Sequence, residues 1–379
     1  MPHYQLALLG FGNVGRALAR LLLRKRAELQ AVYDLTFSVT GIATQRHGSA
    51  IDPDGLDLER ALQAVESGGT LDQLSRWPPS ASSLDFIRAC EADVLFENTP
   101  VNYVDGQPAV DHIRLALELG MHAVTANKGT VVHAYRQLAE LARARGRSFL
   151  FESTVMDGAP IFSLFRHALP AARLRSFRGI LNSTTNLVLS RMEGGETLEQ
   201  AVAYAQSIGI AETDPSGDID GWDAAIKVAA LVTVLMGVDL KPAQVERQGI
   251  RNITPAMIED ARLKGMRWKL VCSALRQGES VQARVAPEMV TPNSPLFSVD
   301  GTTSVVQFES DVLGLLSVIE ADPGPDTTAY GLLADFINAV RETLKPPGFP
   351  GQSPAEPGSP RRYSYTPYTG RYGNRPYMA

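Results

Sequence analysis

Cysteine is almost absent from this chain of 379 residues, in which Cys90 and Cys272 are the only two. Two cysteines cannot form a disulfide framework or a thiolate metal cluster within the chain. Long hydrophobic runs are also missing, and the first residues lead straight into a short apolar stretch without the basic and apolar regions of a secretory signal. We therefore expect a soluble protein of the reducing cytoplasm, with no membrane partner.

An excess of positive charge and metal-ligand patterns are absent as well. The formal net charge of −5 gives no general attraction to nucleic acid, so none is expected as a partner. The histidines show no spacing typical of a metal site, and we expect each of them on the surface or in the core: His3, His47, His112, His122, His133 and His167.

The chain is too long for one ordinary core, so two main domains are expected. Residues 1–152 are predicted to bind a dinucleotide, 153–322 to form an α+β domain, and 323–344 to form a helix that returns to the first domain. Residues 345–379 are rich in proline, tyrosine and arginine, and no packed core can form from such a composition. We expect an extended arm that lies on its own oligomer or stays mobile, with binding to nucleic acid or a partner chain as the alternative.

The most informative pattern of the first half is an apolar stretch, residues 4–10, that leads into a glycine turn and then into a helical pattern. This order is the context that a dinucleotide-binding fingerprint requires. Gly10 permits the tight turn, Gly12 lets a pyrophosphate approach the backbone, and Gly15 allows close packing of helix on strand. The helix N-terminus adds amide donors and a positive dipole. The residues of the turn predicted to bind the cofactor are Gly10, Phe11, Gly12, Asn13, Val14 and Gly15.

The end of the second predicted strand indicates which dinucleotide binds. Asp34 lies at about the distance past the glycines where a ribose-binding carboxylate is expected, but it precedes the strand predicted over 35–43 instead of ending it. Arg46 follows that strand, and an arginine suits a 2′-phosphate. We therefore predict NADP as the cofactor, with NAD as the alternative.

Polar residues follow two further predicted strands, at 97–100 and 125–128. Ligands of a doubly wound sheet bind at the carboxyl ends of its strands, so Asn98, Thr99 and Lys128 join the predicted cofactor-binding residues. The alternative for Lys128 is an ordinary solvated loop lysine. The alternation of short strands with helices predicts an α/β fold with a Rossmann-type, doubly wound parallel sheet.

In the second half, carboxylates crowd into the segment 206–227. If the apolar run from residue 222 is a helix, Asp223 and Lys227 lie on one face, a turn apart. The alternative is a capped helix with a surface ion pair, worth only a few tenths of a kcal/mol. Around this segment, helical stretches group with a largely antiparallel set of strands, which predicts an α+β second domain.

Together these motifs resemble homoserine dehydrogenase in its short form, without a C-terminal regulatory domain. The resemblance covers residues 4–340. Besides the glycine turn, it rests on the segments 125–129 (Thr-Ala-Asn-Lys-Gly), 152–155 (Glu-Ser-Thr-Val), 179–186 and 209–227.

The resemblance implies reversible hydride transfer between homoserine and aspartate 4-semialdehyde, a step in threonine and methionine biosynthesis. It implies that Lys227 transfers the proton, that Lys128 faces the nicotinamide and the substrate hydroxyl, and that Asp223 orients the reacting group. A cation near the oxygen is also what aldehyde reduction needs on physical grounds, because negative charge develops there.

For the substrate and the assembly the resemblance implies further groups. Glu212 and Asp218 would hold the amino group, as a zwitterionic substrate requires, and Asn182 and Thr184 would complete the substrate site. The second domain would also carry a homodimer contact. A monovalent cation, Na⁺ or K⁺, would bind near the hinge, at Glu152, Val155, Asp157 and Ala159.

The sequence departs from the family pattern at three places. Ser183 replaces a glycine, Met156 and Asp157 replace small residues, and the acidic, proline-containing loop 320–328 replaces a glycine-rich one. One alternative is therefore a paralogous NAD(P)-dependent dehydrogenase of another small hydroxy or oxo acid. Another is a catalytically silent nucleotide-sensing or interaction protein, against which the intact lysines and Asp223 argue.

Overall fold

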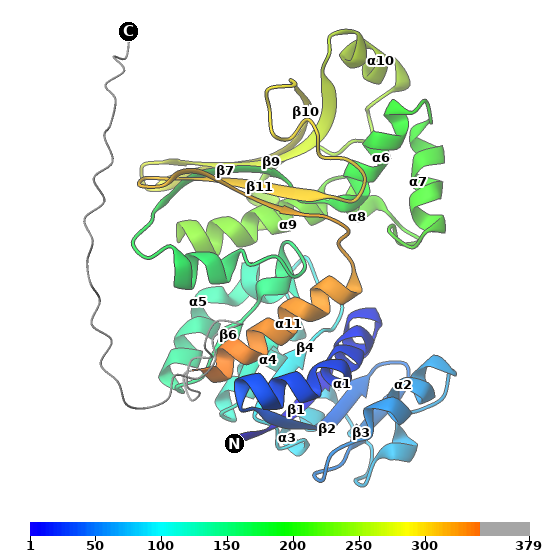
Figure 1. The fold of residues 1–379 in the computed structure, drawn as a ribbon, viewed down its shortest axis with the longest axis vertical. Coiled ribbons are helices and arrows are strands. Elements are labelled where there is room, and N and C mark those ends of the chain that lie inside the picture. The colour runs from blue at the N-terminus through cyan, green and yellow to red at the C-terminus, as the bar shows by residue number, and fades with distance from the viewer. Residues whose placement is uncertain (342–379) are drawn as a thin grey trace, which may run out of the picture. The chain divides into compact units, whose positions relative to one another are not determined.

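The computed structural model describes residues 1–341, which contain two six-stranded sheets with helices packed against them (Figure 1). The expected arm at 345–379 lies outside the described residues. The predicted fold class is confirmed, because one sheet is largely parallel and doubly wound while the other is largely antiparallel.

The first sheet has the strand order β3-β2-β1-β4-β5-β6. Neighbouring strands are parallel except for β2 and β3, which pair antiparallel around the turn at residues 45–47. The sequence predicts a wholly parallel sheet, and this hairpin is the correction; a turn of three residues can join antiparallel strands but is too short for a parallel crossover. The strands are β1 (His3–Leu9), β2 (Thr36–Thr44), β3 (Gly48–Ile51), β4 (Val94–Glu97), β5 (His122–Thr125) and β6 (Phe149–Leu150).

Helices cover both faces of this sheet. Successive side chains of β1 enter different parts of the core: Leu6 and Leu8 join one apolar cluster and Ala7 and Leu9 another. Burial on both faces explains why the strands are almost continuously apolar. The helices are α1 (Asn13–Tyr33), α2 (Leu58–Glu66), α3 (Ser83–Ala89), α4 (Ala109–Glu118), α5 (Lys128–Ala144) and, from the end of the described chain, α11 (Pro325–Val340), which packs against α1.

The second sheet has the order β12-β11-β7-β9-β10-β8 and is antiparallel except for β8 beside β10. Its strands are β7 (Leu174–Ile180), β8 (Glu246–Arg247), β9 (Arg267–Gln277), β10 (Ser280–Val290), β11 (Ser304–Ser310) and β12 (Gly314–Glu320). The helices of this half are α6 (Ser183–Glu193), α7 (Leu198–Ser207), α8 (Ser216–Ile219), α9 (Trp222–Leu231) and α10 (Pro255–Leu263).

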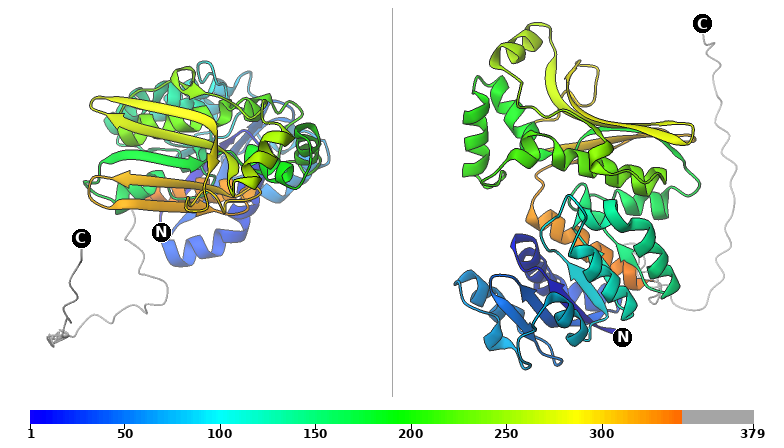
Figure 2. Two further views of the ribbon diagram at one scale, coloured as in Figure 1. Left: turned by 90° about the horizontal axis from the view of Figure 1, so that it is seen from above. Right: turned by 180° about the vertical axis from the view of Figure 1, so that it is seen from behind.

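Helix α9 lies between the second sheet and α5, with contacts to β9 and β10 as well as to α5 (Figure 2). It is apolar on nearly all sides, as a helix enclosed by other elements must be, and eight of its ten residues are buried. The helix expected from residue 222 ends at Leu231 and continues as a π-helical turn, Val232–Met236. Another π-helical turn spans Leu164–Ala168.

Helix α11 is tied to the turn that follows β6. The backbone N–H of Glu152 donates to Asp335 Oδ2 at 2.7 Å, and Ser153 Oγ donates to the carbonyl of Thr328 at 2.8 Å. Among the described residues, no helix combines the length and the apolar character that a membrane span requires.

Candidate active site

An aspartate between two lysines forms the centre of the candidate site. Asp223, in the first turn of α9, accepts a hydrogen bond from Lys128 Nζ at 2.7 Å through Oδ1 and lies 3.0 Å from Lys227 Nζ through Oδ2. Lys227 Nζ also donates to the carbonyl of Leu181 at 2.8 Å. The prediction that Asp223 and Lys227 share one face is confirmed. The alternative of a surface ion pair is wrong, because these side chains are only 12% and 16% exposed.

The opposite charges of this cluster outweigh its burial. Burial by itself would raise the pKa of Asp223, but Lys128 and Lys227 hold that pKa well below its ordinary value. Burial would likewise lower the pKa of Lys128, but the Asp223 carboxylate keeps it above its ordinary value. An ionised carboxylate is thus fixed beside a charged amine at neutral pH.

Asn182 and Asp218 complete the buried side of the cluster. Asn182 is the N-cap of α6, where its Oδ1 accepts from Thr185 N at 2.8 Å. Its Nδ2 donates to Asp218 Oδ1 at 2.6 Å and to Asp223 Oδ2 at 3.0 Å. Burial and the nearby Asp223 raise the pKa of Asp218. Asn182 is expected to bind substrate, but its side-chain amide is hydrogen-bonded to groups of the protein.

The other two expected substrate residues differ in position: Thr184 lies against Asp218, where its hydrogen bond opposes the rise in the pKa of that carboxyl, and Glu212 lies at the surface. Thr184 is buried and its Oγ1 points to the carbonyl of Ile210 at 3.4 Å. Glu212 is exposed on the loop that carries the carboxylates, and its backbone carbonyl accepts from Gln206 Nε2 at 3.1 Å. Glu212 is therefore accessible from solvent.

Tyr103 is a member of the site that the sequence interpretation missed. Tyr103 is 40% exposed, but partial burial of its phenol and the carboxylates of Asp223 and Asp218 raise its pKa, so the phenol lies within electrostatic reach of both. His133 Nε2 lies 3.1 Å from the Tyr103 carbonyl and ties the loop to α5. Tyr103 lies three residues beyond the strand-end segment 97–100, and no motif of the sequence marks it.

The glycine turn adjoins the lysine cluster through a short series of contacts. A Cβ on Gly10 would lie 2.4 Å from the carbonyl oxygen of Asn98, so turn and strand end touch. The carbonyl of Thr99 in turn accepts from Asn127 Nδ2 at 3.0 Å, and Asn127 is the N-cap of α5, which begins at Lys128. The residues predicted from two strand ends are therefore brought together at one edge of the sheet, as the doubly wound topology requires.

The turn has the features that a dinucleotide needs. Gly10 has φ +95°, which favours glycine, and a Cβ on Gly15 would lie 2.3 Å from the Gly10 carbonyl oxygen. Gly12 is different, because a Cβ there would meet no described atom within 4 Å. Both side-chain polar atoms of Asn98 are buried and have no partner among the described residues. Space above Gly12 and an unsatisfied amide on Asn98, which adjoins Gly10, fit a bound pyrophosphate and nicotinamide.

The remaining residues predicted to bind the cofactor differ in their burial. Phe11 is buried in the core, so only its backbone faces the turn. Asn13 and Val14 open α1, and Asn13 Oδ1 accepts from Arg16 at 2.8 Å. Arg46 is exposed on the turn between β2 and β3. As the sequence indicates, Asp34 precedes β2; it caps the end of α1.

Alanine substitutions in the turn should separate folding from cofactor binding. We expect Gly12→Ala to fold normally but to bind NADPH at least tenfold more weakly, because its Cβ meets no protein atom and enters the cofactor's space. Gly10→Ala should instead lower the melting temperature, because its Cβ collides with Asn98. Thermal unfolding and fluorescence titration with NADPH measure the two effects; unchanged NADPH affinity in Gly12→Ala would contradict the placement of the pyrophosphate.

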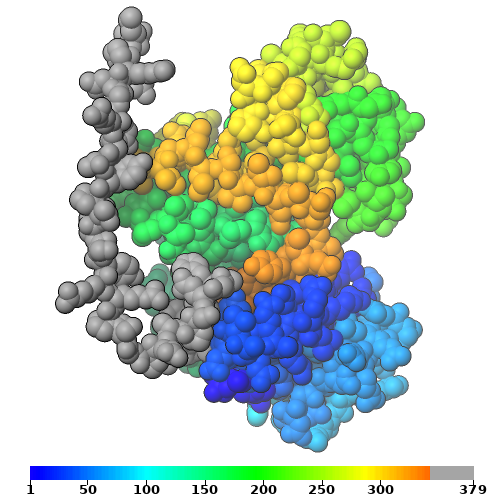
Figure 3. All heavy atoms as spheres, in the orientation of Figure 1, coloured from blue at the N-terminus to red at the C-terminus, as the bar shows by residue number. Residues whose placement is uncertain are grey.

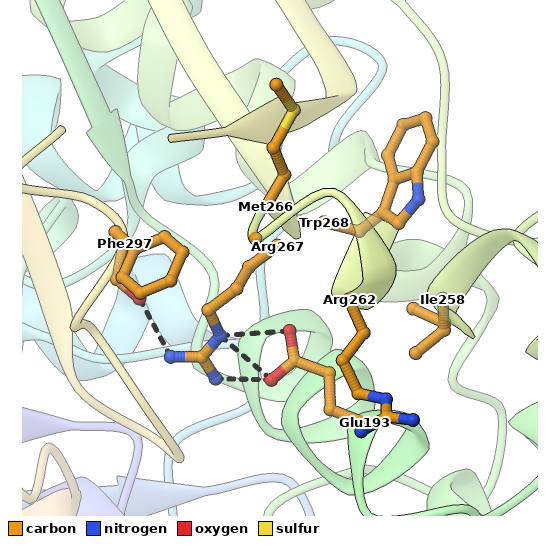
Figure 4. A pocket seen from close by; sticks show the side chains of 8 residues that line it. Glu193, Ile258, Arg262, Met266, Arg267, Trp268 and Phe297 are labelled. Carbon is orange, nitrogen blue, oxygen red and sulfur yellow. Dashed lines mark hydrogen bonds and ion pairs between the residues drawn. The ribbon is translucent and has the colours of Figure 1, made fainter. Parts of the chain in front are cut away.

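A separate cavity of about 240 Å³ lies between α6, α10 and β9 (Figure 4). It is lined mainly by apolar side chains, including Ile258, Trp268 and Phe297. The guanidinium of Arg267 at its edge bonds to Glu193, Asp300 and the carbonyl of Phe297. Because that guanidinium is already engaged and no member of the lysine cluster lines the cavity, we do not include it in the candidate site.

Comparison with known proteins agrees with this geometry. A family model described as "Homoserine dehydrogenase, NAD binding domain" matches residues 10–152, and one described as "Homoserine dehydrogenase" matches residues 160–337. The NAD(+)-dependent homoserine dehydrogenase of Pseudomonas canavaninivorans is 37% identical over 339 residues, which are 89% of this chain and 96% of that protein. The chain belongs to the homoserine dehydrogenase family.

Other members of the homoserine dehydrogenase family support the assignment. The homoserine dehydrogenase of Methanocaldococcus jannaschii is 37% identical over 89% of this chain and 99% of its own length. The structure of a hyperthermophilic archaeal homoserine dehydrogenase in complex with NADPH superposes with a TM-score of 0.76 at 28% identity, covering 91% of this chain and 99% of that one. The structure from Thermoplasma acidophilum also gives 0.76, at 26% identity, over 89% and 99% of the two chains. The chain is thus an NAD(P)-dependent oxidoreductase by family.

Two departures from the homoserine dehydrogenase pattern meet in space. Asp157 has φ +34° and its Oδ2 accepts from Thr327 Oγ1 at 3.2 Å, while Glu320 Oε1 accepts from the N–H of Gly158 at 3.3 Å. Burial and the neighbouring Asp157 raise the pKa of Glu320 to about 7. The replacement at Asp157 and the replaced loop 320–328 are therefore in contact, next to the hinge residues Glu152–Ala159.

Proposed function

We propose that this protein catalyses the NAD(P)-dependent interconversion of L-homoserine and L-aspartate 4-semialdehyde. The observation that carries the proposal is the buried cluster of Lys128, Asp223 and Lys227, joined to the glycine turn through Thr99 and Asn127 in a chain of this family. Such a cluster offers both a proton and positive charge at the edge of a cofactor crevice.

In the proposed reaction each residue has a distinct task. Bound NAD(P)H supplies the hydride; the turn Gly10–Gly15, Asn98 and Thr99 would hold it. Lys227 donates a proton from Nζ to the carbonyl oxygen as negative charge develops there, and accepts it back in the reverse direction. Lys128 adds a second positive charge, and Asp223 fixes both amines.

Acidic groups recognise the substrate in this proposal. Asp218 lies beside the lysine cluster and Glu212 at the rim, so an ammonium group between them would be attracted by both. An aldehyde group on the same small molecule then lies towards Lys227. Acidic groups at one end of the site and a lysine at the other suit an amino acid whose reactive group lies at the far end of its side chain.

The test of this function is direct. Purified protein is mixed with aspartate 4-semialdehyde and NADPH or NADH, and loss of the reduced nicotinamide absorbance is followed. Turnover supports the proposal, whereas binding of NADPH without turnover would contradict it. That second outcome would favour a dehydrogenase of another small hydroxy or oxo acid, for which the juxtaposed Asp157 and Glu320 are the motivating observation.

For the cofactor we propose NADP, with Arg46 binding the 2′-phosphate. The N–H of Gly10 donates to the carbonyl of Ala43 at 2.9 Å, so the end of β2 adjoins the glycine turn, and Arg46 follows two residues after β2 ends. Arg46→Ala should reduce the preference for NADPH over NADH about tenfold or more, the value of one charged hydrogen bond. The ratio of the two dissociation constants measures it, with Arg76→Ala as the control, since Arg76 pairs with Asp52 and Asp54. An unchanged ratio would contradict the role of Arg46.

We also propose the domain division 1–152, 153–322 and 323–344, with a homodimer formed through the second sheet in the cytoplasm. Support for the dimer comes from the β11–β12 hairpin, which lies on the visible face in Figure 3 and leaves Leu313, Leu315 and Ile319 more than half exposed. Sedimentation equilibrium checks this, and a monomer at micromolar concentration would contradict it.

A monovalent cation at the hinge completes the proposal. Glu152 is buried, and its two carboxylate oxygens accept from the N–H groups of Phe162 and Ser163 at 2.6 and 2.7 Å. Each oxygen keeps a further lone pair for a cation held also by the carbonyls of Val155, Asp157 and Ala159. Equal melting temperatures in NaCl, KCl and tetramethylammonium chloride would contradict this site.

A further inference from the structure

Asn182 is a neutral side chain that contacts the carboxylates of both Asp218 and Asp223. Its Nδ2 donates to Asp218 and to Asp223, and its Oδ1 accepts from the N–H of Thr185 at 2.8 Å. The single proton of the Thr185 hydroxyl points either to this oxygen at 2.8 Å or to the Asn182 carbonyl at 3.1 Å. A primary amide has two N–H donors and one oxygen with two lone pairs. Both donors and at least one lone pair are used within the protein, so Asn182 has no N–H left to donate to a substrate.

The orientation of this amide follows from its surroundings. The N–H of Thr185 can only donate, so the amide atom that faces it must be the oxygen. The NH₂ group must then face the carboxylates, which can only accept when ionised. Asn182 is 4% exposed, and in such surroundings each bond to a charged acceptor is strong.

This arrangement completes the ring of donors around Asp223. Its carboxylate is contacted by Lys128, Lys227 and Asn182. The residue before Asn182, Leu181, holds Lys227 through its carbonyl at 2.8 Å. The segment Leu181–Asn182, between β7 and α6, therefore positions both the amine and the carboxylate that the reaction uses.

We propose that Asn182 is a positioning residue for this reaction: it bridges Asp218 to Asp223 and so holds Asp223 between the two lysines. This inference rests on the proposed function, but it assigns Asn182 a role other than the substrate contact that the family resemblance implies. With the amide between them, the two acids have different roles: Asp223 pairs with the lysines, and Asp218 faces the substrate.

The substitution Asn182→Asp tests the proposal without removing the helix cap. Aspartate caps helices as well as asparagine does, so the bond to Thr185 N is retained. Only the bridging NH₂ is replaced, by an oxygen that faces two carboxylates. Thr254→Asp is the matched control, because Thr254 caps α10 through the same type of bond, to Met257 N at 3.3 Å, away from the lysine cluster.

For Asn182→Asp we expect kcat for homoserine oxidation to fall about 10²-fold, the cost of a small misplacement of reacting groups. KM for homoserine should stay within a few-fold. Homoserine oxidation needs an uncharged Lys227 as proton acceptor, so its rate should rise with pH. In Asn182→Asp this rise should move to higher pH, because a third carboxylate disfavours loss of the proton from the amine. The control should match the unsubstituted protein in kcat and pH profile.

The outcomes separate the two proposals. If the unsubstituted protein turns over homoserine but Asn182→Asp keeps kcat and the pH profile, the positioning role is wrong. If only KM rises, Asn182 is a substrate ligand and the positioning role is again wrong. Failure of the unsubstituted protein to turn over homoserine would instead count against the proposed function, whatever the variant does.

Discussion

Replacing Lys227 by alanine should lower kcat for aspartate semialdehyde reduction by about 10²–10⁴-fold, the usual contribution of a positioned general acid. The effect should fall on kcat, because the amine acts on the reacting oxygen, while NADPH affinity should stay unchanged. The cofactor residues belong to other elements, the glycine turn after β1 and the ends of β4 and β5. In the direction of homoserine oxidation, the increase of rate with pH should disappear along with the proton acceptor.

The chain offers a closely matched control for this experiment. Lys264, the C-cap residue of α10, lies four residues after Asp260 and pairs with it at 2.6 Å, the same spacing as Asp223 and Lys227, but both side chains are more than half exposed. Lys264→Ala should therefore leave kcat unchanged. If Lys227→Ala retains more than a tenth of kcat, Lys227 is not the proton-transfer residue, and Lys128 becomes the candidate.

Replacing Asp223 by asparagine should destabilise the protein by about 3–5 kcal/mol, the cost of leaving buried charge without its partner. Lys128 would lose its counterion in surroundings where burial alone would lower its pKa. Activity should fall as well, because the carboxylate fixes both amines. Urea unfolding at neutral pH measures the stability, and spectrophotometric turnover measures the activity.

Asp220 is the control for this substitution. It lies three residues earlier and pairs with Arg251 at 2.8 Å, but at the surface, where the arginine side chain is 60% exposed. Asp220→Asn should cost no more than about 1 kcal/mol, as surface pairs usually do. If both variants lost the same free energy of unfolding, the buried Lys128–Asp223 pair would contribute no more to stability than a surface pair, which would contradict the prediction.

The pH dependence of the Asp223→Asn effect follows from the direction of the pKa shifts. The pKa of Asp223 is lowered in the folded state, so its contribution to stability is fully present above its ordinary value of 3.8 and is lost as the pH falls below it. The pKa of Lys128 is raised, so its contribution is present below its ordinary value of 10.5 and is lost above it. The difference in stability between Asp223→Asn and the unsubstituted protein should therefore be constant between those limits and shrink at both ends.

Several features of the site can be derived from short stretches of sequence. The glycine turn could be predicted because Gly10, Gly12 and Gly15 lie between an apolar strand and an apolar helix. At each of these positions a side chain would collide with the backbone or occupy the space of a cofactor. The shared face of Asp223 and Lys227 could be predicted because a helix of 3.6 residues per turn brings positions four apart together. The strand-end position of Lys128 follows from similar local reasoning.

Other features have no such signal. Sequence alone allowed a solvated loop lysine at position 128, because nothing near it indicates a partner 95 residues away. The bridging role of Asn182 depends on two acids on a different segment. Strand β3 was missed because it is only four residues long and gives a weak strand pattern. The π-helical turn after α9 was missed because its apolar pattern continues that of the helix without a break.

The sequence alone determined the class of fold through the order of its strands and helices. It also determined the cofactor turn and the acid–lysine pair of α9, because each of these depends on backbone geometry and apolar spacing over fewer than about twenty residues. Only the tertiary structure decided that Lys128, Asn182 and Asp223 meet, that their charges are buried, and that Asp157 lies beside Glu320. These contacts arise because α9 packs between α5 and the second sheet and because α11 returns to the hinge. Burial then strengthens each ion pair and shifts each pKa, and burial is a property of that packing.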